Sequence, residues 1–316
     1  MNTLITGVNG FAGSYLAEHL LSQGMSVHGT VRPGSAVADP LKAAVTLHEV
    51  DLMDAPAVAR AVSEVAPDLI FHLAALSSVS GSWADPADTL TNNICCQLNV
   101  LQSVLTADLD PRILIVGSKE EYGMLHPDEL PVAEDNPLRP TSPYGVSKVA
   151  QDLMGYQFFL SHGLRCVRVR PFNHIGPRQG DEFVVPAIAR QVAEAEAGLH
   201  PPLVHVGNLE VKRDFTDVRD VVRAYHLILL HGEPGEVYNI GSGAMVSLGY
   251  ILEFLLERAS VTLSVEQDQA RLRPGDVAEC VCDYSRLQRQ TGWRPQIPLQ
   301  QTLEDTLHYW REKVKG

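Results

Sequence analysis

The chain has 316 residues, of which 45% are hydrophobic, and its formal net charge at pH 7 is −13. This composition predicts a globular protein and excludes a disordered one, and the acidic balance argues against a nucleic-acid partner, because phosphate backbones require clustered Lys and Arg. The apolar runs are shorter than the roughly 20 residues of a membrane span, and the N-terminus has no signal-peptide pattern, so we expect a cytoplasmic protein without a membrane partner.

The first predicted element is a short strand over residues 2–6, which leads into a glycine turn and a helix with the sequence SYLAEHLLSQG. Gly7, Gly10 and Gly13 have the spacing G-x-x-G-x-x-G, whereas the standard dinucleotide fingerprint is G-x-G-x-x-G. Such a turn lets the backbone approach a pyrophosphate, with free N–H groups and the positive end of the helix dipole directed at the phosphates. The order strand, glycine turn, helix favours nucleotide binding over an ordinary turn.

Short apolar runs alternate with helical patterns through the rest of the first half. The predicted strands are SVHGTV after the first helix, AVTLHEV before Asp51, DLIFHLAA near residue 71 and RILIVGS near residue 115. This alternation predicts an α/β fold, a doubly wound parallel sheet with helices on both faces, whose ligands bind beyond the carboxyl ends of the strands. That edge brings together residues that are distant in sequence: Arg32, Asp51, Leu52, Leu73, Ala74, Ala75 and Ser118.

Arg32 bears on the choice of cofactor, because it follows the second predicted strand. An acidic residue there would bind the ribose 2′-OH of NAD, whereas an Arg suits the 2′-phosphate of NADP. The segment Val31-Arg32-Pro33 contains no acid. We therefore expect NADP (NADPH), with NAD as the alternative, although a solvated loop Arg looks the same in a sequence.

Tyr144 and Lys148 lie four residues apart in the segment SPYGVSKVAQDL, on one face of a predicted helix. An ammonium beside a phenol favours the phenolate and draws the Tyr pKa from about 10 toward neutrality, where proton exchange with a substrate oxygen becomes useful. The pair is a candidate proton donor. Tyr and Lys at this spacing also occur by chance in amphipathic helices, so the pair needs support from the rest of the chain.

Three features together resemble the extended branch of the short-chain dehydrogenase/reductase family: the GxxGxxG turn, Ser118 after the fifth strand, and the Y-x-x-x-K of Tyr144 and Lys148. In the second half, RPFNHIGPRQG, VGNLEVKRDFTDVRDVVRAY and RLRPGDV resemble the GDP-sugar members, the GDP-mannose 4,6-dehydratases and the GDP-4-keto-6-deoxymannose reductases. The resemblance covers essentially the whole chain. It implies a Rossmann fold with a smaller, discontinuous α/β lobe that binds a nucleotide sugar.

The resemblance also implies roles for individual residues. Ser118 would hydrogen-bond the sugar O4, Tyr144 would exchange a proton with that oxygen, and Lys148 would hold the nicotinamide ribose and lower the pKa of Tyr144. The implied cofactor contacts are Gly7, Asn9, Gly10, Phe11, Ala12, Gly13, Arg32, Asp51, Leu52, Leu73, Ala74, Ala75, Tyr144, Lys148 and His174. The implied substrate contacts are Ser77, Asn173, Arg178, Asn208, Arg213 and Arg273. As alternatives, His174 is a structural histidine, and Arg213 and Arg273 pair with nearby aspartates at the surface.

Glu120 decides between two activities of the GDP-sugar members. A dehydratase must remove the C5 proton and expel the C6 hydroxyl, which requires an acid/base besides Ser118 and Tyr144, and Glu120 matches the acidic residue of the dehydratase motif. Lys119 would keep this carboxylate ionised if the two side chains converge, although adjacent side chains in an extended segment point apart. The segments GSKEEYG and RPFNHIGPRQ resemble the reductase members more closely than the dehydratases.

We therefore expect an NADPH-dependent reductase of the C4 ketone of GDP-4-keto-6-deoxy-D-mannose, which forms GDP-6-deoxy-D-mannose (GDP-D-rhamnose). The main alternative is a GDP-mannose 4,6-dehydratase, in which NADP is an internal redox cofactor and Glu120 the acid/base. Minor alternatives are another nucleotide-sugar epimerase or dehydratase and a non-catalytic NADP-binding module.

Domain organisation follows from the order of the predicted elements. We expect residues 1–170 to form the NADP-binding domain, with returning segments near 214–241, and residues 171–316 to form mainly the substrate lobe. The family implies a homodimer through a four-helix interface, built from the helix around 89–105 and the helix that begins at Ser142. Five cysteines without C-x-x-C spacing predict reduced thiols and no metal site.

Overall fold

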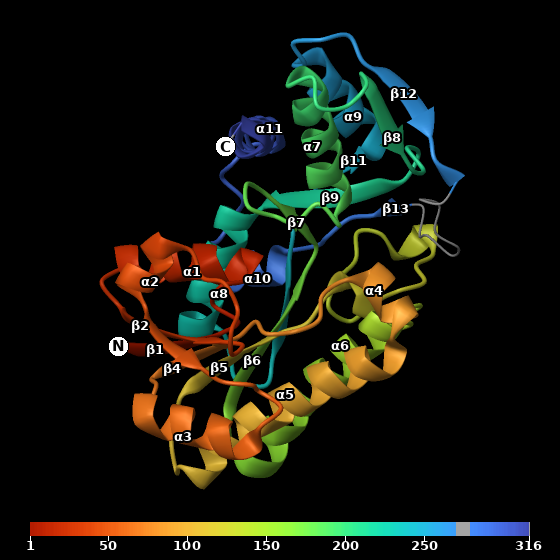
Figure 1. Cartoon of the computed structure of the whole chain (residues 1–316). Helices are drawn as coiled ribbons and strands as arrows, with labels where there is room; N and C mark the ends of the chain where they lie inside the picture. The colour runs from red at the N-terminus through yellow and green to blue at the C-terminus, as the bar shows by residue number, and fades with distance from the viewer. Residues whose placement is uncertain (270–278, 316) are drawn as a thin grey trace.

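The computed structural model describes residues 1–269 and 279–315. Its larger lobe is built on a seven-stranded parallel sheet with the strand order β10-β6-β5-β4-β1-β2-β3 (Figure 1). The strands are β1 (Asn2–Thr6), β2 (Ser26–Val31), β3 (Thr46–Glu49), β4 (Leu69–His72), β5 (Arg112–Val116), β6 (Arg165–Pro171) and β10 (Val237–Ile240). The predicted doubly wound parallel sheet is confirmed.

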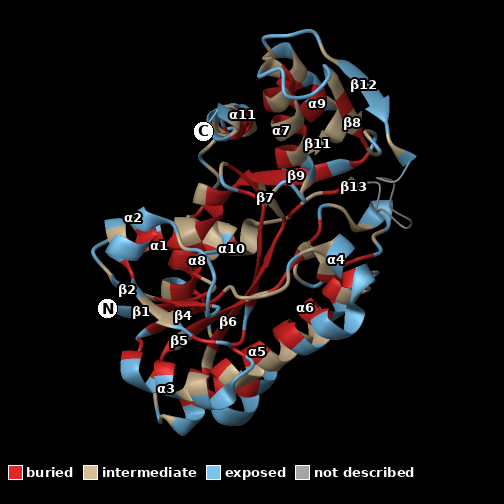
Figure 2. Cartoon of the chain, viewed as in Figure 1, coloured by how far each residue is buried: buried red, intermediate tan, exposed pale blue. Residues whose placement is uncertain are grey.

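Helices cover both faces of the sheet, which explains the near-continuous apolar runs of its strands. One face carries α1 (Phe11–Ser22), α2 (Asp39–Ala44), α8 (Val218–His231) and α10 (Ser285–Thr291), and the other carries α3 (Ala55–Val65), α5 (Pro86–Thr106) and α6 (Pro143–His162). Neighbouring residues of β1 alternate between these layers, since Ile5 packs in the first core cluster and Leu4 in the second. Figure 2 shows the sheet as a buried layer between half-exposed helices.

The smaller lobe is assembled mainly from the second half of the chain. It contains β7 (Asn173–Ile175), α7 (Val184–Glu196), β8 (Leu203–Val206), β9 (Lys212–Asp217), β11 (Met245–Ser247), α9 (Leu248–Glu257), β12 (Ser264–Gln267), β13 (Glu279–Cys280) and α11 (Leu299–Lys315). A separate core cluster joins α7, α9 and α11 with β8 and β9. Between the two halves of the lobe, α8 and β10 return to the sheet, because α8 packs on α1 and β10 pairs with β6. A domain boundary near residue 170 stays a prediction.

Short elements follow two of the strands at the sheet edge where the ligands of such folds bind. Helix α4 (Val79–Ala84) follows β4, and the 3-10 turns η1 (Lys119–Glu121) and η2 (Pro127–Glu129) follow β5. Helix α1 begins at Phe11, three residues earlier than the sequence pattern suggested, so that Gly13 lies inside the helix. Among the described residues, no helix combines the length and the apolar character needed to cross a membrane.

Candidate active site

A cavity of about 1400 Å³ lies at the carboxyl ends of the sheet strands and is lined by residues of both lobes. Its walls contain most of the residues singled out in the sequence: Gly7, Asn9, Gly10, Phe11, Ala12, Gly13, Arg32, Asp51, Leu52, Leu73, Ala74, Ala75, Ser77, Ser118, Glu120, Tyr144, Lys148, Asn173, His174, Asn208 and Arg213. The parallel topology brings these segments together, because successive strands end at the same edge.

The glycine turn between β1 and α1 forms one end of the cavity. Gly7 has a φ of +69°, and a Cβ on Gly13 would lie 2.3 Å from the Gly7 carbonyl oxygen, so both positions need glycine. The Gly10 cap of α1 makes no side-chain hydrogen bond to the first amides of the helix. The turn therefore leaves backbone N–H groups and close access for a pyrophosphate, which fits a dinucleotide.

Arg32 lies exposed at the end of β2, on the wall of the same cavity. It forms no ion pair within the described ranges 1–269 and 279–315. Asn9 braces the loop that follows Arg32, since its Nδ2 donates to Ser35 Oγ at 3.3 Å and to the Ala36 carbonyl at 3.1 Å. Asp51 accepts a hydrogen bond from the Met53 N–H at 2.9 Å. The arrangement fits a cofactor with a 2′-phosphate near Arg32.

Ser118, Tyr144 and Lys148 converge at the centre of the cavity wall. Helix α6 begins sharply beneath Tyr144, because Ser142 accepts a hydrogen bond from the Gly145 N–H at 3.0 Å and Pro143 occupies the first helical position. Ser118 lies close enough to Tyr144 for its side chain to lower the Tyr144 pKa. Lys148 Nζ donates to the Val116 carbonyl at 2.8 Å and lies 5.8 Å from the centre of the Tyr144 ring. The pattern Y-x-x-x-K thus faces the end of β5, as its helical spacing predicts.

Burial controls the ionisation of this pair. Tyr144 and Lys148 are only 8% and 4% exposed. Burial raises the pKa of Tyr144, against a smaller lowering by the Ser118 hydrogen bond, and burial lowers the pKa of Lys148 to about 8. The sequence-based expectation that Lys148 draws the Tyr144 pKa toward neutrality is therefore wrong for the protein without ligands, because desolvation disfavours both charged forms. Tyr144 is protonated at neutral pH and ready to donate.

Lys119 and Glu120 form an ion pair beside Ser118. The sequence suggested that these adjacent side chains point apart, as they would in an extended segment. Here residues 119–121 form a 3-10 turn, capped by the Ser118 hydroxyl, which accepts from the Glu120 N–H at 3.2 Å. The turn lets the two side chains converge, and the cation favours the ionised carboxylate.

The predicted substrate residues are distributed unevenly. Ser77, Asn173, Asn208 and Arg213 line the cavity, and Asn173 Oδ1 is buried without a hydrogen-bond partner among the described residues, as expected of an acceptor that awaits a ligand. Arg273 lies outside the described residues. His174 Nδ1 lies 3.2 Å from the Phe172 carbonyl, and the His174 ring stacks on Phe11 with 5.9 Å between ring centres.

Arg178 departs from the predicted position. It is not among the described residues that line the cavity. Its guanidinium donates two hydrogen bonds to the Glu18 carboxylate, at 2.5 and 3.0 Å, and lies 3.6 Å from the centre of the Tyr15 ring. The backbone of Arg178 is left-handed, with a φ of +72°. The Arg178 side chain packs on α1 through Glu18 and Tyr15.

Several cavity residues were missed by sequence reasoning. Trp83 in α4 is 63% exposed, although it lines the cavity. Gln179, which donates to the His174 carbonyl at 3.0 Å, also lines it. Trp83 belongs to no motif, whereas Gln179 stands in the segment RPFNHIGPRQG, which could have indicated it.

Comparisons with known proteins find relatives that match nearly the whole chain. The sequence model of the family described as GDP-mannose 4,6 dehydratase matches residues 4–306. A GDP-6-deoxy-D-mannose reductase from Pseudomonas aeruginosa is 35% identical over 98% of this chain and 97% of its own length, and a GDP-mannose 4,6-dehydratase from Vibrio cholerae is 30% identical over 94% and 90%. A solved structure of RMD from Pseudomonas aeruginosa in complex with NADPH superposes with a TM-score of 0.86 and 32% identity, covering 99% of this chain and 100% of that one.

Proposed function

Because the chain belongs to the GDP-mannose 4,6-dehydratase family of extended short-chain dehydrogenases/reductases, we propose that it reduces the C4 ketone of GDP-4-keto-6-deoxy-D-mannose with NADPH. The product is GDP-6-deoxy-D-mannose, also called GDP-D-rhamnose. The observation that carries this function is the convergence of Ser118, Tyr144 and Lys148 on one cavity wall beside the glycine turn.

The cavity offers matching groups for each part of NADPH. The glycine turn would hold the pyrophosphate, Arg32 the 2′-phosphate, and Asp51 with Leu52 the adenine, while Lys148 would hold the nicotinamide ribose. Bound NADPH supplies a hydride for the carbonyl carbon. On the substrate side, Arg213 lines the cavity and would bind the diphosphate of a GDP-sugar. Ser77, Asn173 and Asn208 would add polar contacts.

The protein's own residues then control the proton. Ser118 donates a hydrogen bond to the ketone oxygen O4 and orients it toward Tyr144, which lines the same cavity wall. As charge develops on O4, the Tyr144 hydroxyl donates its proton to that oxygen. Burial keeps the phenol protonated at neutral pH, which is the state a proton donor requires.

The pair of Lys119 and Glu120 favours reduction over dehydration. A dehydratase needs Glu120 to take the C5 proton and to deliver a proton to the leaving C6 hydroxyl. The ion pair with Lys119 engages this carboxylate, which a dehydratase would use for both proton transfers. Glu120 nevertheless lines the cavity, and the family includes dehydratases, so GDP-mannose 4,6-dehydration is the second candidate.

Product analysis separates the two candidates. Purified protein is incubated with GDP-mannose alone, and separately with GDP-4-keto-6-deoxy-D-mannose and NADPH. We expect NADPH oxidation only with the ketone, and a product heavier than the ketone by two hydrogens in mass spectrometry. Loss of water from GDP-mannose without added reductant would identify a dehydratase instead, and NADPH binding without turnover of either sugar would identify a non-catalytic module.

Arg32→Ala tests the cofactor. Loss of charge-assisted hydrogen bonds to a 2′-phosphate should raise the Kd of NADPH by about 10- to 100-fold, while NADH binding changes little. Quenching of protein fluorescence measures both constants. Arg60→Ala, which removes an Arg from α3 outside the cavity, is the matched control and should change neither. Equal losses for NADPH and NADH would contradict the 2′-phosphate assignment.

We also propose that the protein is a homodimer in the cytoplasm. Helices α5 and α6 pack side by side on the sheet (Figure 1), and the outer face of α6 exposes four large apolar side chains: Val146, Leu153, Tyr156 and Leu160. Apolar side chains gathered on one helix face support burial in an interface. The same two helices from a second subunit would complete a four-helix interface.

A further inference from the structure

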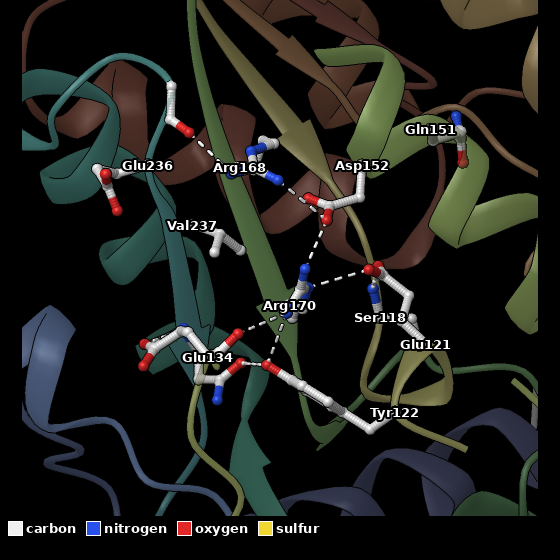
Figure 3. Close-up of polar contacts among 12 residues, drawn as sticks. Ser118, Glu121, Tyr122, Glu134, Gln151, Asp152, Arg168, Arg170, Glu236 and Val237 are labelled. Carbon is white, nitrogen blue, oxygen red and sulfur yellow. Dashed lines mark hydrogen bonds and ion pairs between the residues drawn. The ribbon is translucent and has the colours of Figure 1, made fainter. Parts of the chain in front are cut away.

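A network of buried ions lies directly behind Ser118 (Figure 3). Glu121 is fully buried, and its Oε1 accepts a hydrogen bond from the Ser118 N–H at 2.7 Å. Its other oxygen, Oε2, accepts from Arg170 Nε at 3.0 Å. Gly117 makes room for this carboxylate, because a Cβ there would lie 2.1 Å from Glu121 Oε1. The Ser118 backbone is therefore held by a carboxylate that is itself fixed from behind.

The network continues from the Ser118 turn to the helix that carries the proton donor. Arg170, in β6, donates from Nη2 to Asp152 Oδ2 at 2.6 Å. Asp152 is fully buried in α6, four residues after Lys148 and eight after Tyr144, on the same helical side. One guanidinium thus joins the segment of Ser118 to the helix of Tyr144.

The geometry of Arg170 is fixed on its remaining sides. Its Nη1 donates to the Tyr122 hydroxyl and to the Glu134 carbonyl, both at 3.1 Å. Arg168 supplies a second cation to Asp152 Oδ2 at 3.1 Å, so acids and cations alternate along the network. Buried ion pairs contribute little net stability, because desolvation offsets their attraction, whereas they restrict geometry. The network links the backbone of Ser118 to the helix that carries Tyr144, which favours a role in positioning.

We propose that Glu121, Arg170 and Asp152 act as positioning residues, a bridge that fixes the Ser118 hydroxyl relative to the Tyr144 hydroxyl for proton transfer. This inference rests on the proposed function of Ser118 and Tyr144. If the bridge loosens, the ketone oxygen is held at the wrong distance from its proton donor, and displacements of about 1 Å can cost about 100-fold in rate. The glycine turn, Arg32 and Lys148, the residues proposed to bind NADPH, are unchanged in variants of the bridge, so binding of NADPH at neutral pH should be preserved.

Glu121→Gln is the principal test. The amide still occupies the space, but its NH2 group faces a donor of Arg170 or of Ser118, so one link breaks. We expect kcat to fall by about 10- to 100-fold, with the KM of the sugar and the Kd of NADPH within about twofold of wild type. The alkaline decline of kcat/KM for NADPH should move to lower pH, because the Glu121 carboxylate raises the pKa of Lys148 and its charge is lost in the variant.

Glu134→Gln is the matched control. Glu134 is another buried glutamate of the same region, and its side chain accepts from the Asn239 N–H at 2.8 Å without reaching Ser118. We expect both variants to lower the thermal midpoint, while kcat falls only in Glu121→Gln. Arg170→Lys, which keeps the charge but cannot span two carboxylates, should reproduce the kcat loss and serves if Glu121→Gln does not fold.

The outcomes separate the bridge from the proposed function. Each variant is assayed with whichever sugar wild type converts, since both candidate reactions use Ser118 and Tyr144. Wild-type turnover of the ketone supports the reductase, whatever the variants do. Glu121→Gln and Arg170→Lys with wild-type kcat, or with losses matched by Glu134→Gln, would overturn the bridge alone. A wild-type protein that converts neither sugar would overturn both.

Discussion

Replacing Tyr144 with Phe lowers kcat for ketone reduction by about 10²- to 10⁴-fold, the usual contribution of a positioned general acid. In the proposed mechanism the hydroxyl of Tyr144 donates to O4, and the buried ring fills the same space in the Phe variant. NADPH binding should be preserved, because the glycine turn and Arg32 are untouched. The measurement is NADPH oxidation at 340 nm with saturating ketone, alongside fluorescence titration of NADPH.

Tyr156→Phe provides the control for this experiment. Tyr156 lies in α6 like Tyr144 but is 40% exposed, with its ring 4.9 Å from the Arg168 guanidinium carbon and outside the cavity. Removal of its hydroxyl should leave kcat within about twofold. Wild-type turnover by Tyr144→Phe would show that another group donates the proton, and Glu120 would be the next candidate.

The sheet could be predicted because both of its faces are buried. The run RILIV is apolar on both sides of the strand and forms β5, whereas NTLIT and SVHGTV mix apolar residues with Ser, Thr and His and form β1 and β2. The start of α1 was less visible, since Gly10 caps it through the backbone alone and Gly13 resembles part of the turn. Glycine is required at position 13 because α1 closely approaches the Gly7 carbonyl. A local sequence pattern does not show such a contact.

The candidate site could be predicted where one element supplies the spacing. Tyr144 and Lys148 lie on one turn of a helix, and the glycines lie close together at the start of α1. Each group therefore forms a motif that can be recognised in the sequence. The bridge behind Ser118 could not be predicted, because Glu121, Asp152 and Arg170 come from a 3-10 turn, a helix and a strand. The substrate role of Arg178 stays a prediction, since in the structure its guanidinium contacts Glu18 and Tyr15.

Lys148→Met should lower kcat/KM for NADPH by about 100-fold or more, because it removes both a positive charge beside Tyr144 and the proposed contact with the nicotinamide ribose. Met fills a similar volume, so folding is preserved. The loss should differ from that of Tyr144→Phe in one respect. Lys148 acts on binding as well as on chemistry, and so the Kd of NADPH rises too, as fluorescence titration would detect.

The pH dependence identifies the charge as the cause. Burial lowers the Lys148 pKa to about 8, so the ammonium is present below that pH and is lost as the pH rises through it. Wild-type kcat/KM for NADPH, which reports ionisation of the free enzyme, should therefore decline above pH 8. Lys148→Arg stays charged throughout this range and should retain partial activity without that decline. Because burial raises the Tyr144 pKa instead, the phenol loses its proton at much higher pH, and the two limbs do not overlap. A decline near pH 8 that persists in Lys148→Met would assign the titration to another group and leave the lysine with packing alone.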